Sequence, residues 1–145
     1  MYKADIIKRY KQFNNFGREQ NMDFKLLSPG EIEYYFKVQE KHLATPNVVH
    51  GGAIAGFMDA TLAVAGLSYT LEDNNVVSTV EFKINYLKPA FLGEELIGRG
   101  KLISAGKRIL FVEADIITQR DGENIIIATG SGTLNAYPAS KAMLA

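Results

Sequence analysis

The pattern of hydrophobic and polar positions singles out one long apolar segment, residues 51–71. It consists mainly of alanine, glycine and larger apolar residues, and its one charged residue is Asp59. A helix that is apolar on all sides is normally buried. We therefore expect a long buried helix here, with the rest of the chain arranged around it.

Six shorter segments have the alternating pattern of strands, in which every second side chain is apolar. These segments are residues 22–26, 32–38, 76–87, 95–103, 108–119 and 124–135. In the third of them, strict alternation places Val80, Phe82, Ile84 and Tyr86 on one face, which we expect to be the core face, and Thr79 on the other.

A short amphipathic segment precedes the first strand. Ile6, Tyr10 and Phe13 recur at helical spacing, and Gly17 stands where a helix commonly ends. This pattern predicts a surface helix over residues 4–16, packed through one apolar stripe.

The order of these elements indicates an α+β fold in a single domain, residues 1–145. Short turns between the last four strands require a mostly antiparallel arrangement. We expect a curved antiparallel six-stranded sheet wrapped around one long central helix, with an N-terminal helical segment in residues 1–19 and a tail of no clear pattern in residues 139–145. One curved sheet does not cover so apolar a helix on every side, so we also expect a second subunit.

Composition and charge narrow the classes of function. The 145 residues are 47% hydrophobic and 22% charged, and the formal net charge is zero, so no overall field attracts nucleic acid or an anionic membrane. With no cysteine and two histidines, His42 and His50, we expect no disulfide, catalytic thiolate or metal site.

The N-terminus lacks the apolar core of a signal peptide, which favours a cytoplasmic location. Asp59 in mid-segment favours a buried core helix over a membrane span.

Asp59 is the first candidate for chemistry. Its neighbours at helical spacing are Ala55, Gly56, Leu62 and Ala63, and none of these can pair its charge. A carboxylate in such surroundings is either satisfied by a group from another element or used in a reaction. The second case makes Asp59 a general base or a nucleophile.

Gly51 and Gly52 form the second candidate feature, because backbone N–H groups at a helix start lack partners within the helix. The helix dipole adds partial positive charge there, which suits a carbonyl oxygen that becomes negative during a reaction. Gly51 and Asp59 are eight residues apart, roughly 12 Å along a helix axis, so one protomer cannot hold a single reacting carbon with both. Two such helices packed antiparallel about a twofold axis would bring Gly51 of one against Asp59 of the other.

Several segments resemble a known family. The end of the loop and most of the long apolar segment resemble the PaaI-type acyl-CoA thioesterases of the hotdog superfamily. This part of the chain reads NVVHGGAIAGFMDATLAVA, with an aspartate nine residues after the histidine. Three later segments also resemble that family. The strand and turn after its helix correspond to VVSTVEFKINYLKPAFLGEEL, and the last two strands of the family correspond to AGKRILFVEADI and IIIATGSGTLNAYP. The resemblance covers about residues 20–138. It implies a hotdog fold and hydrolysis of an acyl-CoA thioester to a free acid and CoA.

The resemblance also implies roles at the matching positions. Asp59 would activate water or attack the thioester carbon, and the Gly51 amide would polarise the thioester carbonyl. His50 would orient that group or hydrogen-bond near it. Thr79 falls where the family often has a Ser or Thr that helps to position the nucleophilic water. Neither a metal nor a separate cofactor is implied, because CoA is part of the substrate.

Four further residues are candidates for binding the substrate: Asn47, Gly52, Lys107 and Arg108. Many family members carry Asn or Gln six residues before the histidine, where this chain has Ala44, and Asn47 would substitute for it from a different angle. Gly52 allows close approach to the backbone. Lys107 and Arg108 follow a turn, where they would meet the phosphates of CoA.

Two other functions stay open at this stage. The first is a hotdog dehydratase or hydratase acting on acyl thioesters, although the loop before the helix of such enzymes differs from TPNVVHGG. The second is a non-catalytic acyl-CoA-binding protein. The pattern also leaves open the acyl group, a dimer against a dimer of dimers, and general base against nucleophile for Asp59.

Overall fold

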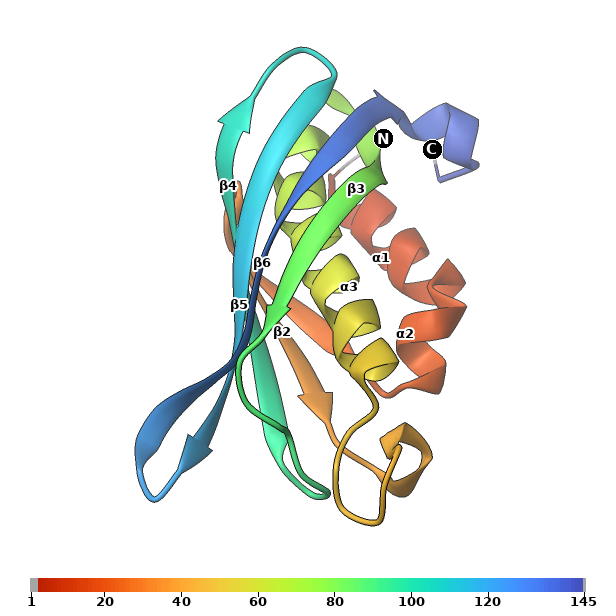
Figure 1. Ribbon diagram of the computed structural model, residues 1–145. Helices are drawn as coiled ribbons and strands as arrows, with labels where there is room; N and C mark the ends of the chain where they lie inside the picture. Colours follow the sequence, from red (N-terminus) through yellow and green to blue (C-terminus); the bar gives the residue numbers. More distant parts are fainter. Residues whose placement is uncertain (1–2, 145) are drawn as a thin grey trace.

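The computed structural model describes residues 3–144, in which six antiparallel strands form one sheet that curves around a long helix (Figure 1). The strand order is β1-β2-β4-β5-β6-β3. The strands are β1 (Asp23–Ser28), β2 (Glu31–Lys37), β3 (Asn75–Tyr86), β4 (Glu95–Ala105), β5 (Ile109–Arg120) and β6 (Glu123–Pro138). The helices are α1 (Lys3–Phe13), α2 (Asn15–Glu19) and α3 (Gly51–Thr70), with 3₁₀ turns η1 (Glu40–His42), η2 (Leu71–Asp73) and η3 (Ala139–Ala142). The predicted α+β fold, a curved six-stranded sheet around one central helix, is confirmed.

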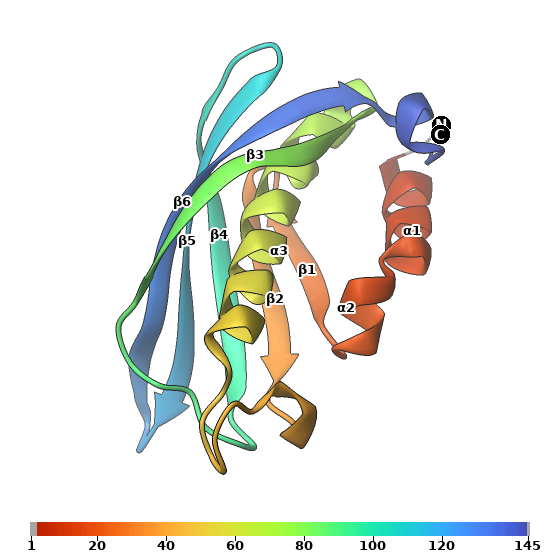
Figure 2. The ribbon, with the colours of Figure 1, turned by 45° about the vertical axis from the view of Figure 1, so that its right-hand side comes forward.

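The N-terminal segment differs from the prediction of one helix over residues 4–16. The chain breaks at Asn14, whose side-chain oxygen accepts a hydrogen bond from Gly17 N at 3.2 Å and so caps α2. Gly17 therefore lies inside a second helix and does not end the first. Figure 2 shows α1 and α2 alongside α3, on the side that faces away from β5 and β6. Residues 1, 2 and 145 of the predicted terminal segments lie outside the described residues.

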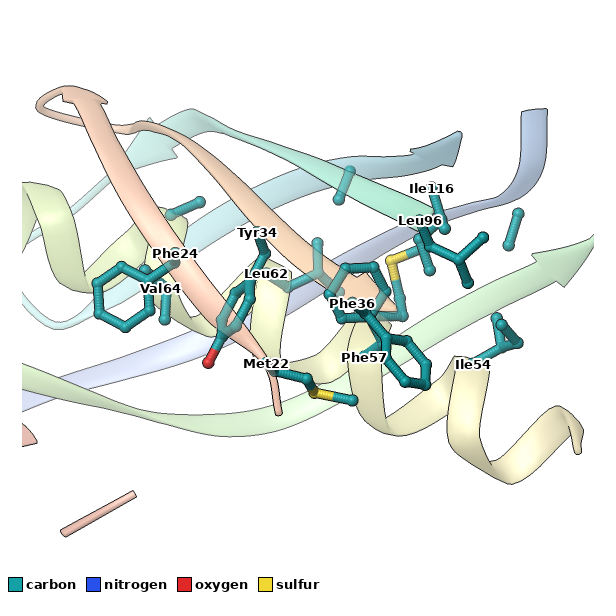
Figure 3. Close-up of a cluster of buried hydrophobic side chains, with 14 of the residues drawn as sticks. Met22, Phe24, Tyr34, Phe36, Ile54, Phe57, Leu62, Val64, Leu96 and Ile116 are labelled. Atoms are coloured by element: carbon teal, nitrogen blue, oxygen red, sulfur yellow. The ribbon is translucent and has the colours of Figure 1, made fainter. Parts of the chain in front are cut away.

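The concave face of the sheet packs on α3 through large apolar side chains (Figure 3). Phe57 of α3 is fully buried, and its ring centroid lies 5.7 Å from that of Tyr34 and 5.2 Å from that of Phe36 on β2. Burial of each such side chain contributes about 1.5–3 kcal/mol. This packing fixes the height and rotation of α3 against the sheet, and with them the direction in which Asp59 points.

Glycine in β4 lets the helix lie close to the sheet. A Cβ atom built on Gly100 would lie 2.8 Å from the backbone oxygen of Thr61 in α3. Any larger residue would therefore push the helix away from β4. Counted with η2, α3 is long and apolar enough to span a membrane, but 67% of its apolar window is buried in the fold. It is the core helix that the position of Asp59 in mid-segment favoured.

Strand β3 forms one edge of the sheet, and a β-bulge interrupts it. The pairing with β6 passes from Thr79 directly to Glu81, so Val80 has no partner and its side chain is 60% exposed. The prediction that Val80 faces the core and Thr79 the opposite side was therefore wrong. A bulge inserts one extra residue and reverses the facing of the residues beyond it. Here it turns Thr79 toward α3.

Candidate active site

Asp59 and Thr79 form a hydrogen-bonded pair between α3 and β3. The Thr79 hydroxyl donates to Asp59 Oδ1 at 2.7 Å, and the pair is partly buried. Within residues 3–144, Asp59 forms no ion pair, and its Oδ2 accepts no hydrogen bond. The carboxylate is thus held in orientation by one oxygen, and the other oxygen is free to accept a proton.

His50 caps the start of α3 and leaves one amide unpaired. Gly52 N donates to His50 Nδ1 at 2.7 Å, and the N–H groups of Ala53 and Ile54 both donate to the His50 carbonyl oxygen. Because Nδ1 accepts, this hydrogen bond assigns the ring proton to Nε2. Gly51 N has no acceptor among residues 3–144. It is the first helical N–H group, and it is free to bind an oxygen that carries negative charge.

Tyr86 is a residue of this site that the sequence analysis assigned to the core. It lies on the predicted face of β3, since its hydroxyl donates to the Gly51 carbonyl oxygen of α3 at 2.8 Å, but its side chain is 52% exposed. Its position in the sequence could have indicated this role, because Tyr86 is the last residue of the strand that also contains Thr79. A recess of about 270 Å³ lies beside it. The recess is lined by Val49, Gly51, Ile54, Tyr86, Leu87, Lys88, Pro89 and Ala90.

The two halves of the site lie apart within one protomer. Gly51 is the first residue of α3, and Asp59 follows eight residues later in the same continuous helix. The rise of an α-helix separates them by roughly 12 Å. In one chain the carboxylate and the free amide therefore cannot contact the same carbon, as the spacing predicted.

The predicted substrate-binding residues are divided in the same way. Asn47 is exposed in the loop before α3, near Gly51, and its backbone oxygen accepts from Leu92 N. Lys107 and Arg108 lie in the turn between β4 and β5, at the opposite end of the sheet from the start of α3 (Figure 1). Arg108 donates to the Asn135 side chain at 3.5 Å. Asn135 pairs with Ser78, so the basic turn lies on the Thr79 side of the molecule.

His42 is buried, and both of its ring nitrogens are hydrogen-bonded within the fold. Its side chain is 3% exposed, Nδ1 accepts from Gln39 N at 2.9 Å, and Nε2 lies 2.9 Å from Gln20 Oε1. Burial lowers the pKa of this imidazole below its ordinary value, and the nearby charge of Lys41 lowers it further. Nδ1 thus bonds within η1, and Nε2 joins η1 to the end of α2.

A second hollow, of about 620 Å³, lies elsewhere, on the sheet face turned away from α3. It is lined mainly by polar and charged residues of β2, β4, β5, β6 and β3, among them Glu33, Arg99, Asp115 and Lys83. None of the predicted site residues lines it. Among residues 3–144 no group of three or more His, Cys, Asp or Glu side chains is placed to hold a metal ion.

Comparison with known proteins connects this geometry to a family. Residues 46–125, which include the loop before α3, Asp59 and Thr79, match the family model described as Thioesterase superfamily. The chain belongs to the thioesterase superfamily. The matched range is more than half of the chain and contains both halves of the candidate site.

Relatives and solved structures agree with this membership. Human acyl-coenzyme A thioesterase 13 is 28% identical over 130 residues, which cover 89% of this chain and 90% of that protein. The E. coli PaaI protein from the phenylacetic acid degradation operon superposes with a TM-score of 0.82 at 17% identity, over 93% of each chain. A hypothetical thioesterase from Streptococcus pneumoniae, solved with coenzyme A, gives 0.76 at 21% identity, over 89% of this chain and 97% of that one. The thioesterase family and the PaaI-type hotdog fold that the sequence resembled are confirmed, and the protein is a thioester hydrolase.

Proposed function

We propose that this member of the thioesterase superfamily is an acyl-CoA thioesterase, which hydrolyses an acyl-CoA to a carboxylic acid and free CoA. Two observations on α3 together carry the proposal. Asp59 is held by Thr79 through one carboxylate oxygen, and the Gly51 N–H has no acceptor among residues 3–144. The name of the human relative and the coenzyme A in the S. pneumoniae structure support the choice of thioester.

In the proposed reaction Asp59 acts through its free oxygen. As a general base, Oδ2 takes a proton from water while the water oxygen attacks the thioester carbon; as a nucleophile, the carboxylate attacks that carbon itself and water later cleaves the anhydride. In both routes the carbonyl oxygen becomes negative and accepts a hydrogen bond from the Gly51 N–H. The carbon–sulfur bond then breaks and CoA leaves as a thiolate. Thr79 keeps the carboxylate in place, and His50 holds the first turn of α3 and presents its Nε2–H beside it.

We further propose that each active site is shared by two protomers. β3 is an edge strand, and the exposed Val80 side chain lies at its bulge. The face of α3 around Asp59 is partly exposed and includes the small residues Ala55 and Ala63, while Phe16 of α2 lies against Gly56. An unpaired edge beside a small-residue helix face suits pairing with a second copy. A twofold axis there would bring Gly51 of one protomer opposite Asp59 of the other, and a dimer of dimers would repeat the arrangement.

The same symmetry gives the basic turn a role. Lys107 and Arg108 lie at the Thr79 end of their own protomer, so in a twofold dimer they would approach the Gly51 end of the other. There they would bind the phosphates of CoA, while Gly52 and the Asn47 side chain contact the thioester end. Asn47 takes the part that Asn or Gln has in many relatives, because Ala44 has no polar side chain. We place this reaction in the cytoplasm.

The test is release of free thiol from a panel of acyl-CoA substrates, with wild type beside Asp59→Asn. The substitution keeps the shape and removes the base, so we expect kcat to fall by about 10²-fold or more. Asp121→Asn is a matched control, because Asp121 is exposed in the β5–β6 turn with a left-handed φ of 52°, which asparagine tolerates. Equal rates in wild type and Asp59→Asn would exclude Asp59 as the catalyst. Binding of acyl-CoA without turnover would favour a non-catalytic binder, and water addition to an enoyl-CoA would favour a hydratase.

A further inference from the structure

The backbone around Gly51 is held on every side except at one group. Two peptide units meet at this residue. The carbonyl of the first, His50 O, accepts from Ala53 N and Ile54 N. The N–H of the second, Gly52 N, donates to His50 Nδ1, and its carbonyl, Gly51 O, accepts from the Tyr86 hydroxyl at 2.8 Å. The remaining group, the Gly51 N–H, is the one that we assign to the reacting carbonyl.

Tyr86 differs from the other partners because it belongs to another element. The His50, Ala53 and Ile54 contacts all arise within the first turn of α3, whereas Tyr86 is the last residue of β3. Its ring also lies 3.6 Å from the position that a Cβ on Gly51 would occupy. The hydroxyl and the ring together fix the start of the helix against the end of the strand.

This connection matters because two consecutive glycines have wide backbone freedom. A hydrogen-bond donor stabilises a developing oxyanion only if its direction is set before the reaction. The strand that holds Gly51 through Tyr86 also holds Asp59 through Thr79, seven residues earlier. A single strand therefore determines where both halves of the site lie along α3.

We propose that Tyr86 is a positioning residue, which orients the Gly51 amide by fixing the peptide unit next to it. The proposal rests on the function proposed above, in which that amide binds the thioester carbonyl. Tyr86 does not contact the reacting atoms in this assignment. Its effect should therefore fall on the rate of the bound complex and not on substrate affinity.

The main experiment compares the kinetics of Tyr86→Phe with wild type, using the best acyl-CoA of the panel. Phenylalanine keeps the ring contact and removes the hydroxyl. We expect kcat to fall about tenfold with KM within about twofold, since the donor is misdirected but still present. Tyr69→Phe is the matched control: Tyr69 lies near the other end of α3, is 40% exposed and has no hydroxyl partner among the described residues, so its removal should change nothing.

A double variant separates positioning from a general structural effect. Gly51→Pro removes the amide hydrogen, so nothing is left for Tyr86 to orient. Tyr86→Phe should then lower kcat no further in the Gly51→Pro background, although it lowers kcat in wild type. Equal and additive losses in both backgrounds would overturn the proposal, as would an unchanged kcat or a rise in KM alone, which would make Tyr86 a substrate contact.

A measurement without substrate makes the proposal independent of the activity. The ¹⁵N order parameter of the Gly51 amide reports its orientation on the picosecond to nanosecond timescale. We expect it to fall in Tyr86→Phe and to stay at the wild-type value in Tyr69→Phe. An unchanged order parameter would overturn the positioning role, even if no acyl-CoA proved to be a substrate and the proposed function failed on its own test.

Discussion

At the scale of single residues, the proposed function depends on groups that the fold leaves incompletely bonded. Asp59 has one carboxylate oxygen that accepts from Thr79 and one that has no partner in the described part of the chain. Gly51 is flanked by bonded amides, and its own N–H has no acceptor in residues 3–144. An unpaired backbone N–H is uncommon, because most such groups find a partner unless water or a ligand takes that place. The proposed acyl transfer requires one free donor and one free acceptor of this kind at each site.

Gly51→Pro tests the free amide by replacing its hydrogen with the Cδ atom of the proline ring. Proline is favoured at the first helical position, and the preceding residue, His50, already has an extended φ of −62° and ψ of 133° that proline accepts. We expect the unfolding midpoint to be retained and kcat to fall by about 10²- to 10³-fold, the usual effect of removing one oxyanion donor. Gly51→Ala is the control: it keeps the N–H, and its Cβ would be in ordinary contact with Tyr86 at 3.6 Å. If the proline variant keeps full activity in thiol-release kinetics, the amide has no part in catalysis.

At the scale of elements, local pattern predicted the helices and strands, and contacts between elements decided the rest. The alternation of apolar residues was enough to predict β2, and the continuous apolar run was enough to predict α3, because burial determines both patterns. The break at Asn14 depends on a side chain that caps the next helix and also contacts the Tyr34 hydroxyl, at 3.2 Å, across the fold. The bulge at Val80 adds one unpaired residue without changing the composition of the strand. Since Thr79 and Tyr86 both bond to α3 from a distant segment, no periodicity in β3 could reveal their roles.

Gly100→Ala tests the close contact between α3 and β4. The new Cβ would lie 2.8 Å from the Thr61 backbone oxygen, which cannot move without shifting the helix. We expect the free energy of unfolding to fall by about 1–3 kcal/mol, as in other overpacked cores. Denaturant titration measures this change, and Gly106→Ala in the exposed β4–β5 turn, with one neighbour at 3.4 Å, serves as the control. Equal stability of the two variants would mean that α3 is not held by contact with this strand.

At the scale of the whole molecule, the geometry of one protomer is incomplete for the proposed reaction. A continuous helix separates the carboxylate from the amide, and the sheet separates the basic turn from the recess beside Tyr86. Helix propensity and strand alternation specify a protomer, whereas its assembly depends on surface shape. Two features of the sequence carry information about assembly: the apolar character of α3 on every side, and the eight-residue spacing between Gly51 and Asp59.

A mixed dimer of Gly51→Pro and Asp59→Asn protomers tests whether the sites are shared. In a twofold dimer with shared sites, one site receives both substitutions and the other receives neither, because it combines the intact Gly51 of one chain with the intact Asp59 of the other. Dimers that carry two different affinity tags, purified through both, should therefore have about half of the wild-type kcat per dimer, while each parent homodimer stays nearly inactive. Sites built within one protomer would leave every protomer of the mixed dimer defective, and its activity would match that of the parents. Sedimentation at the assay concentration provides the control for assembly, and a monomeric wild type that hydrolyses acyl-CoA at full rate would exclude the shared site.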